Sequence, residues 1–216
     1  MLILLPPSEG KNQPISKANT NLAKLVFANE LIEIRSRLLT KSLVASSAAK
    51  AIDVYSGVLY QALDWKSLSP AAKARGEKSI LITSAIFGVL RPNDLIPNYK
   101  AKIKTSDWKT ALKPVLDGLK ADLVIDCRSS TYAGTWQSPP LTTVAVRVFK
   151  KERGKISVIT HLSKKYRGEL TRVLLKSGKP PKSPSELLVI AEKHFECKLH
   201  KSRGNLPWYL DLIISA

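Results

Sequence analysis

The hydrophobic pattern opens with a continuous apolar run, which predicts a buried strand. Residues 1–5 read MLILL and are followed at once by Pro6-Pro7 and a short polar loop. Short apolar runs at 79–83 and 121–127 predict two further buried strands. Polar loops that follow such strands would leave the sheet at the edge where open α/β sheets bind ligands.

Apolar residues at three- and four-residue spacing separate these runs and predict amphipathic helices. The expected helices cover residues 22–39, 42–63 (as one or two helices), 107–120, 162–176 and 185–194. The remaining expected strands are a hairpin of 142–149 with 156–161, and short strands at 196–200 and 207–214. Strands that alternate with helices indicate an α/β fold, and the hairpin makes the sheet mixed. Since no repeat or linker interrupts the chain, we predict a single compact domain, residues 1–216, with a central mixed β-sheet flanked by helices.

The charge of the chain is large and uneven. The sequence has 35 Lys and Arg against 17 Asp and Glu, a net charge of +18. Residues 150–182 hold eleven Lys and Arg and two Glu, whereas residues 183–216 are neutral overall. Half of the excess charge therefore lies in 33 residues, which indicates a surface that faces a polyanion. Such a surface would bind nucleic acid with an affinity that falls with salt.

Several classes of protein are disfavoured by the same composition. No run approaches the ~18 apolar residues of a membrane-spanning helix, so we expect no membrane partner. The opening run is too short for a signal peptide and lacks a basic leader. Cys127 and Cys197 lie far apart without metal-ligand spacing, so we expect neither a metal site nor a cofactor. A cytoplasmic protein is the expected class.

The loop after the first strand carries a hydroxyl, a carboxylate and an ammonium group, on Ser8, Glu9 and Lys11. It is not a P-loop, because Leu5 stands where the first glycine would be and Asn12 follows the lysine. Lys11 is a candidate for contacting an anion. The alternative is a turn with a solvated lysine.

Two further polar segments follow predicted strands. Arg91 and Asp94 are three residues apart and are suited either to an internal ion pair that fixes a loop or to a binding site. Cys127 directly follows Asp126, but a phosphatase C-x5-R motif would need arginine at position 133, which is Ala133. We therefore expect a buried cysteine at a strand end. Arg128 and the adjacent Ser129 remain candidate phosphate contacts.

The segment around residue 164 carries the strongest hint of anion binding. Lys164 and Lys165 lie near the start of a predicted helix, where cations oppose the helix macrodipole. Arg167 would extend the basic face along phosphates. His161 precedes them at a predicted strand end, where a hydrogen-bonded structural histidine is expected more often than a catalytic base.

Five stretches of the chain together resemble the YaaA family of bacterial peroxide-stress proteins, in particular its shorter form that begins LLPPSEGK. The stretches are LLPPSEGK at 4–11, YSGVLY at 55–60, FGVLRPND at 87–94, DCRSSTY at 126–132 and SKKYRG at 163–168. They span nearly the whole chain, and GVLRP-x-D is the most specific. The resemblance implies a compact α/β fold, a basic cleft that binds duplex or branched DNA, and a role in limiting peroxide damage linked to intracellular iron.

The resemblance also implies a set of nucleic-acid-binding residues, namely Lys11, Arg91, Arg128, Lys164, Lys165 and Arg167. Phosphate contacts would supply most of the affinity, with little reading of base sequence. The alternative is an enzyme that acts on a phosphate-bearing small molecule or nucleic acid, with Lys11 and Arg91 holding the phosphate. Its pocket would use Ser8, Glu9, Asp94, Asp126, Ser129 and His161. No catalytic triad or metal spacing supports this alternative, so no catalytic residue is assigned.

Overall fold

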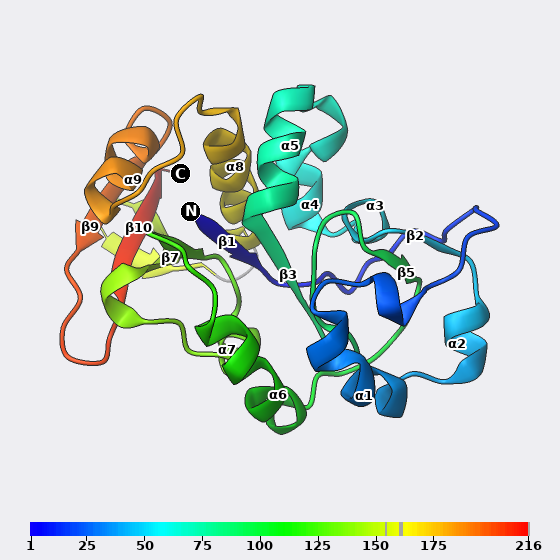
Figure 1. Cartoon of the computed structure of the whole chain (residues 1–216). Helices are drawn as coiled ribbons and strands as arrows, with labels where there is room; N and C mark the ends of the chain where they lie inside the picture. The colour runs from blue at the N-terminus through cyan, green and yellow to red at the C-terminus, as the bar shows by residue number, and fades with distance from the viewer. Residues whose placement is uncertain (154, 160–161, 216) are drawn as a thin grey trace.

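A computed structural model describes residues 1–153, 155–159 and 162–215. Its main feature is an eight-stranded mixed sheet in the order β4-β3-β1-β6-β7-β10-β9, with β8 paired to β7 (Figure 1). The strands are β1 (Leu2–Leu5), β3 (Ile80–Ser84), β4 (Gly88–Leu90), β6 (Val124–Asp126), β7 (Thr143–Glu152), β8 (Lys155–Val158), β9 (Glu196–His200) and β10 (Trp208–Ser215). A separate small sheet pairs β2 (Ala48–Lys50) with β5 (Leu95–Pro97).

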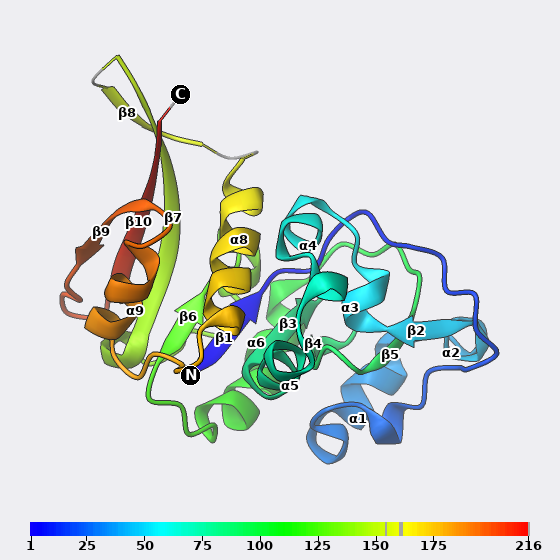
Figure 2. The same ribbon diagram turned by 90° about the horizontal axis from the view of Figure 1, so that it is seen from above.

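Helices flank the main sheet on both faces (Figure 2). The α-helices are α1 (Ala28–Leu38), α2 (Lys41–Ala45), α3 (Ala51–Val54), α4 (Val58–Leu63), α5 (Pro70–Ser79), α6 (Thr105–Asp117), α7 (Ser130–Ala133), α8 (Ser163–Lys176) and α9 (Pro184–Ala191). The short 3₁₀ helices are η1 (Leu22–Lys24), η2 (Trp65–Ser67) and η3 (Pro140–Thr142). None of the described helices is long and apolar enough to cross a lipid bilayer.

The first strand is buried on both faces, as its continuous apolar sequence predicts. Successive side chains of a strand point to opposite faces. Accordingly, Ile3 and Leu5 join the larger core cluster, whereas Leu2 and Leu4 join a second cluster. The larger cluster includes residues of α4 and α8, and the second includes residues of α1 and α6. Covering both faces is what a parallel sheet requires.

Five neighbouring strands run parallel, namely β3, β1, β6, β7 and β10. Their carboxyl ends therefore lie along one edge of the sheet, here called the carboxyl edge. The loops that begin at Pro6, Ala85 and Cys127 all leave the sheet at this edge. The polar segments that follow β1 and β6 are thus brought to the same side of the molecule, as the sequence predicts.

Helix α8 is held close to α4 by a glycine. A Cβ atom on Gly168 would overlap the carbonyl group of Leu59 and would lie 3.0 Å from Cβ of Ala62. This close approach fixes the position of α8, and with it the basic residues of its first turns, relative to the carboxyl edge.

The α/β fold with a mixed central sheet is confirmed, but several elements differ from the sequence-based expectation. Segment 42–63 contains α2, β2, α3 and α4 rather than one or two helices. Helix α5 was not expected, because it buries only small residues (Ala72, Gly76 and Ser79) and has no apolar stripe. Helix α6 accommodates Pro114 in its interior. The expected strand 156–161 is β8 at Lys155–Val158, and residues 160–161 lie outside the described part of the chain.

Candidate functional site

The loop after β1 is anchored to the start of α4 through Ser8. Its Oγ accepts hydrogen bonds from the backbone N–H groups of Ser56 and Gly57, both at 3.1 Å. A side chain at Gly57 would not fit, because its Cβ would lie 2.8 Å from Cβ of Ser8. The Ser8 hydroxyl therefore holds the loop in place and is not free to bind a ligand.

Lys11 folds back over this loop and packs against tyrosine rings. Its Nζ donates to the carbonyl oxygen of Ser8 at 2.9 Å and lies 4.4 Å from the ring centre of Tyr99. The ring centre of Tyr55 is 5.7 Å away, and the backbones of Lys11 and Tyr55 form a β-bridge. Burial lowers the pKa of Lys11, and the charge of Glu9 partly opposes this shift. We call Ser8, Lys11, Tyr55 and Tyr99 the lysine cluster.

A chain of hydroxyl groups lies beneath Lys11. The hydroxyl of Tyr99 is 2.8 Å from that of Tyr55 and 2.7 Å from Oγ of Ser84, at the end of β3. Burial raises the pKa of Tyr99 to about 12, so this chain is neutral at physiological pH. Burial raises the pKa of Tyr132, and the charge of the exposed Glu9 raises it further. Sequence analysis did not assign these tyrosines to the site.

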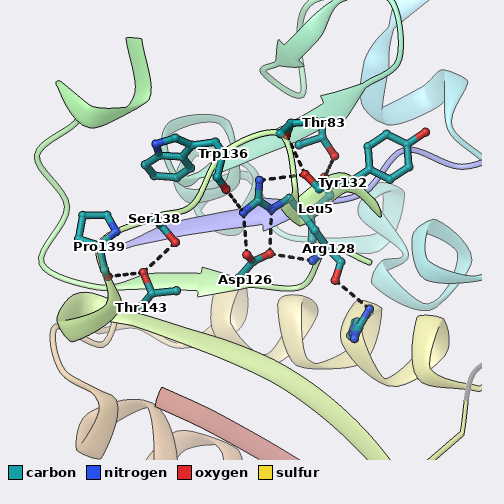
Figure 3. Close-up of polar contacts among 11 residues, drawn as sticks. Leu5, Thr83, Asp126, Arg128, Tyr132, Trp136, Ser138, Pro139 and Thr143 are labelled. Atoms are coloured by element: carbon teal, nitrogen blue, oxygen red, sulfur yellow. Dashed lines mark hydrogen bonds and ion pairs between the residues drawn. The ribbon is translucent and has the colours of Figure 1, made fainter. Parts of the chain in front are cut away.

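Arg128 is buried in an ion pair with Asp126 (Figure 3). Its Nε and Nη2 donate to the two carboxylate oxygens at 2.9 Å and 2.7 Å. The same guanidinium donates to the carbonyl oxygens of Trp136 at 2.9 Å and Tyr132 at 3.3 Å. With only 5% of Arg128 exposed, its charge is committed to holding the loop after β6. Ser129, which precedes α7, makes no side-chain cap bond to that helix.

Arg167 has a similar structural role at the carboxyl edge. Its guanidinium donates to the carbonyl oxygens of Arg128 at 3.1 Å and Val146 at 3.0 Å, which ties α8 to the loop after β6 and to β7. Its Nε is buried without a hydrogen-bond partner among the described residues. Cys127 is fully buried nearby, as expected for a strand-end cysteine, and burial raises its pKa to about 12.

Arg91 and Asp94 lie elsewhere, which corrects the expectation that they join the other site residues. The Arg91 guanidinium donates to the carbonyl oxygens of Lys78 at 2.7 Å and Ile80 at 3.1 Å, at the amino end of β3. The carboxylate of Asp94 accepts from the backbone N–H groups of Arg91 at 2.8 Å and Val26 at 3.3 Å. Both side chains therefore stabilise loops at the edge of the sheet opposite the lysine cluster.

Lys164 and Lys165 are exposed in the first turn of α8, which contains no acidic residue. Lys165 lies 3.7 Å from Glu169 in a half-exposed pair, and Lys164 forms no ion pair within the described part of the chain. His161 lies outside the described residues, so its predicted role stays a prediction.

The hairpin of β7 and β8, which precedes α8 in the chain, carries further cations. We call residues 149–153 and 155–158 the hairpin arm, which extends beyond the amino end of α8 in Figure 2. The arm and the first turn of α8 together form what we call the basic edge, consisting of Lys150, Lys151, Arg153, Lys155, Lys164 and Lys165. Sequence analysis recognised the charge of this region but did not assign the arm lysines to the site.

The described residues of the enzyme alternative, which leave out His161, do not form one enclosed pocket. Asp126 is paired with Arg128, and Arg91 lies at the opposite edge of the sheet. A cavity of about 230 Å³ beside Tyr55 and Tyr60 is lined by neither Lys11 nor Glu9. Within the described residues, no three His, Cys, Asp or Glu side chains gather as a metal site.

Comparisons with known proteins identify relatives over nearly the whole chain. The family model described as Peroxide stress protein YaaA matches residues 1–199. The UPF0246 protein SCO2297 of Streptomyces coelicolor is 30% identical over 99% of this chain and 98% of its own length. The UPF0246 protein CE1889 of Corynebacterium efficiens is 34% identical over 88% of this chain and 91% of its own. Because both the model and these relatives extend over nearly all of the fold described above, the chain belongs to the peroxide stress protein YaaA family, UPF0246.

Proposed function

We propose that this protein binds duplex or branched DNA without sequence preference, through the basic edge, and thereby limits peroxide damage to DNA. The observation that carries the proposal is the local charge. Residues 149–165 contain six Lys and Arg and one Glu. These cations lie at exposed or half-buried positions of the hairpin arm and of the start of α8, and Lys150 and Lys151 form surface ion pairs with Glu152 and Glu196.

The placement of Lys164 and Lys165 supports a phosphate ligand. The amino end of a helix carries partial positive charge, so two lysines there repel it unless an anion is close. DNA phosphates supply such anions, and the positive end of a helix dipole favours them. Arg128 and Arg167 would contribute by fixing this surface, since their own donors are already used within the fold.

A charge-reversal experiment tests the proposal directly. Lys164→Glu with Lys165→Glu should weaken binding to a labelled duplex strongly at ~0.1 M salt and flatten the slope of log affinity against log salt by about one to two. Lys17→Glu with Lys24→Glu is the matched control, because both lysines are exposed and lie near β2 and η1, away from the arm. Equal losses in both variants would show a general charge effect and refute the assigned surface.

Protection of DNA is measured separately. Plasmid exposed to ferrous iron and hydrogen peroxide should accumulate fewer strand breaks with the wild-type protein than with the Lys164/Lys165 double variant. Equal breakage at concentrations where only the wild type coats the plasmid would show that binding does not protect.

A second candidate function, favoured by the lysine cluster, is binding of a small anionic substrate. Lys11 is a half-buried ammonium with a lowered pKa, it lies on tyrosine rings, and the carboxylate of Glu9 lies close by. Inorganic pyrophosphate or a nucleotide at millimolar concentration should then raise the melting temperature of the wild type but not of Lys11→Met. If neither compound shifts the wild type, this candidate is wrong for phosphate ligands.

A further inference from the structure

The hairpin arm lies at the edge of the main sheet and carries two exposed apolar side chains, Ile156 and Val158. Asp126, the last residue of β6, pairs with Ala145, and β7 continues for seven residues beyond that pair. At ~3.3 Å per residue, the end of β7 lies about 23 Å past the end of β6, and β10 flanks β7 as far as Lys151. All four residues of β8 are exposed, and β8 pairs with β7 alone.

The pairing register separates two faces of the arm. Ile156 is opposite Lys151 and Val158 is opposite Phe149, so these four side chains share one face. Ile156 is 57% exposed and Val158 is 70% exposed. Exposed apolar side chains that gather on one face of a strand pair are typical of a surface that binds a partner.

The other face and the tip are polar and mostly basic. Lys150, Glu152 and Lys155 occupy the opposite face, and Arg153 follows at the tip. Arg153 has a φ of 49°, in the left-handed region that tight hairpin turns use. The tip therefore presents cations around an apolar patch.

We propose that the hairpin arm enters the minor groove of duplex DNA, with Ile156 and Val158 pressed between base pairs so that the duplex is kinked. This inference rests on the proposed function and adds a specific mode of contact to it. Apolar wedges such as Ile unstack base steps in minor-groove binders and bend the duplex by roughly 20–90°. The surrounding Lys and Arg would hold the phosphates on either side of the groove.

Charge favours DNA over a second copy of the chain as the occupant. The arm carries four Lys and Arg and one Glu, and the first turn of α8 adds two lysines. Packing two such arms against each other would bring like charges together, whereas a polyanion neutralises them.

Bending and affinity should be measured together on the full-length protein. A 30-base-pair duplex with a dye at each end reports bending by energy transfer and binding by anisotropy. The test variant is Ile156→Ser with Val158→Ser, and the control is Val189→Ser, a 56% exposed apolar residue of α9. Since all three positions are exposed, unchanged melting temperatures are expected.

The wild type and the control should bring the dyes closer on binding. The arm variant should bind roughly tenfold more weakly and lose most of the energy-transfer change, because phosphate contacts remain while the wedge is absent. A wild type that binds without bending, or an arm variant that bends DNA as well as the wild type, overturns the wedge while leaving the proposed function intact. A wild type that does not bind the duplex overturns both. An arm variant that only converts a dimer into a monomer, with DNA binding and bending unchanged, identifies a second copy as the occupant and overturns the wedge.

Discussion

The ion pair between Arg128 and Asp126 gives the sharpest quantitative test of the structure. The Arg128 side chain is 1% exposed and that of Asp126 is 12% exposed, so water screens the pair very little. Asp126→Ala would leave the guanidinium with only the carbonyl oxygens of Trp136 and Tyr132 as partners. A buried charge that loses its counter-ion typically costs ~3–5 kcal/mol of unfolding free energy.

In a protein of this size that loss corresponds to a fall in melting temperature of roughly 6–20 °C. Urea unfolding at pH 7 measures the free energy, and added salt should leave the difference between variant and wild type nearly unchanged. Lys104→Ala is the control, because Lys104 is 77% exposed in its pair with Asp107 and should cost less than ~1 kcal/mol.

The double variant Asp126→Ala/Arg128→Met should be more stable than the sum of the single changes predicts, because it removes both charges. If Asp126→Ala costs no more than the Lys104 control, the ion pair does not hold Arg128. Arg128 would then be available to phosphate, and the assignment of Arg128 as a structural residue would be refuted.

Three further results are expected. Gly168→Ala should destabilise the protein by ~1–3 kcal/mol in thermal or urea unfolding, because its Cβ overlaps α4, whereas Gly178→Ala should change stability by less than ~0.5 kcal/mol, because nothing lies within 4 Å of its Cβ. Cys127, buried with a pKa of about 12, should react with a maleimide at pH 8 only after unfolding, as mapped by mass spectrometry; labelling of the native protein would contradict its burial. Burial lowers the pKa of Lys11, so the folded state binds fewer protons than the unfolded state between that lowered value and 10.5. The stability of the wild type relative to Lys11→Gln should therefore rise with pH across this window, and a flat difference in urea unfolding would refute the shift.

The strands of the sheet could be predicted because their signal is local. Continuous apolar runs at 1–5, 79–83 and 121–127 lie within or around β1, β3 and β6, and the predicted hairpin corresponds to β7 and β8. Helix α5 was not predicted, because its buried positions hold small residues. The sequence of α5 therefore has no apolar stripe. The pairing of β2 with β5 joins segments more than forty residues apart and has no local pattern.

The functional residues were harder to predict, because the sequence alone does not show whether a basic side chain binds a ligand or forms hydrogen bonds within the protein. Arg91, Arg128 and Arg167 each stand in a recognisable motif, yet their donors are used on carbonyl oxygens and, for Arg128, on Asp126. Arginine suits this task, since its planar fork satisfies several fixed acceptors at once. The tyrosines beneath Lys11 could not be assigned to the site from the sequence, because their place depends on which loops meet at the carboxyl edge.

Arginine and lysine have different roles in this protein, and the difference between the guanidinium and ammonium groups explains why. Arg128 and Arg167 tie the loop after β6 to β7 and α8. The lysines of the arm and of the start of α8 lie at exposed or half-exposed positions, where Lys150, Lys151 and Lys165 form surface ion pairs with Glu152, Glu196 and Glu169. Lysine is a flexible, strongly hydrated point charge that can follow phosphates without a fixed geometry. A surface built from lysines on a scaffold cross-linked by arginines is therefore suited to binding the DNA backbone irrespective of sequence. We therefore expect substitution of the arginines to lower the stability of the protein. Substitution of the lysines should lower its affinity for DNA and the dependence of that affinity on salt.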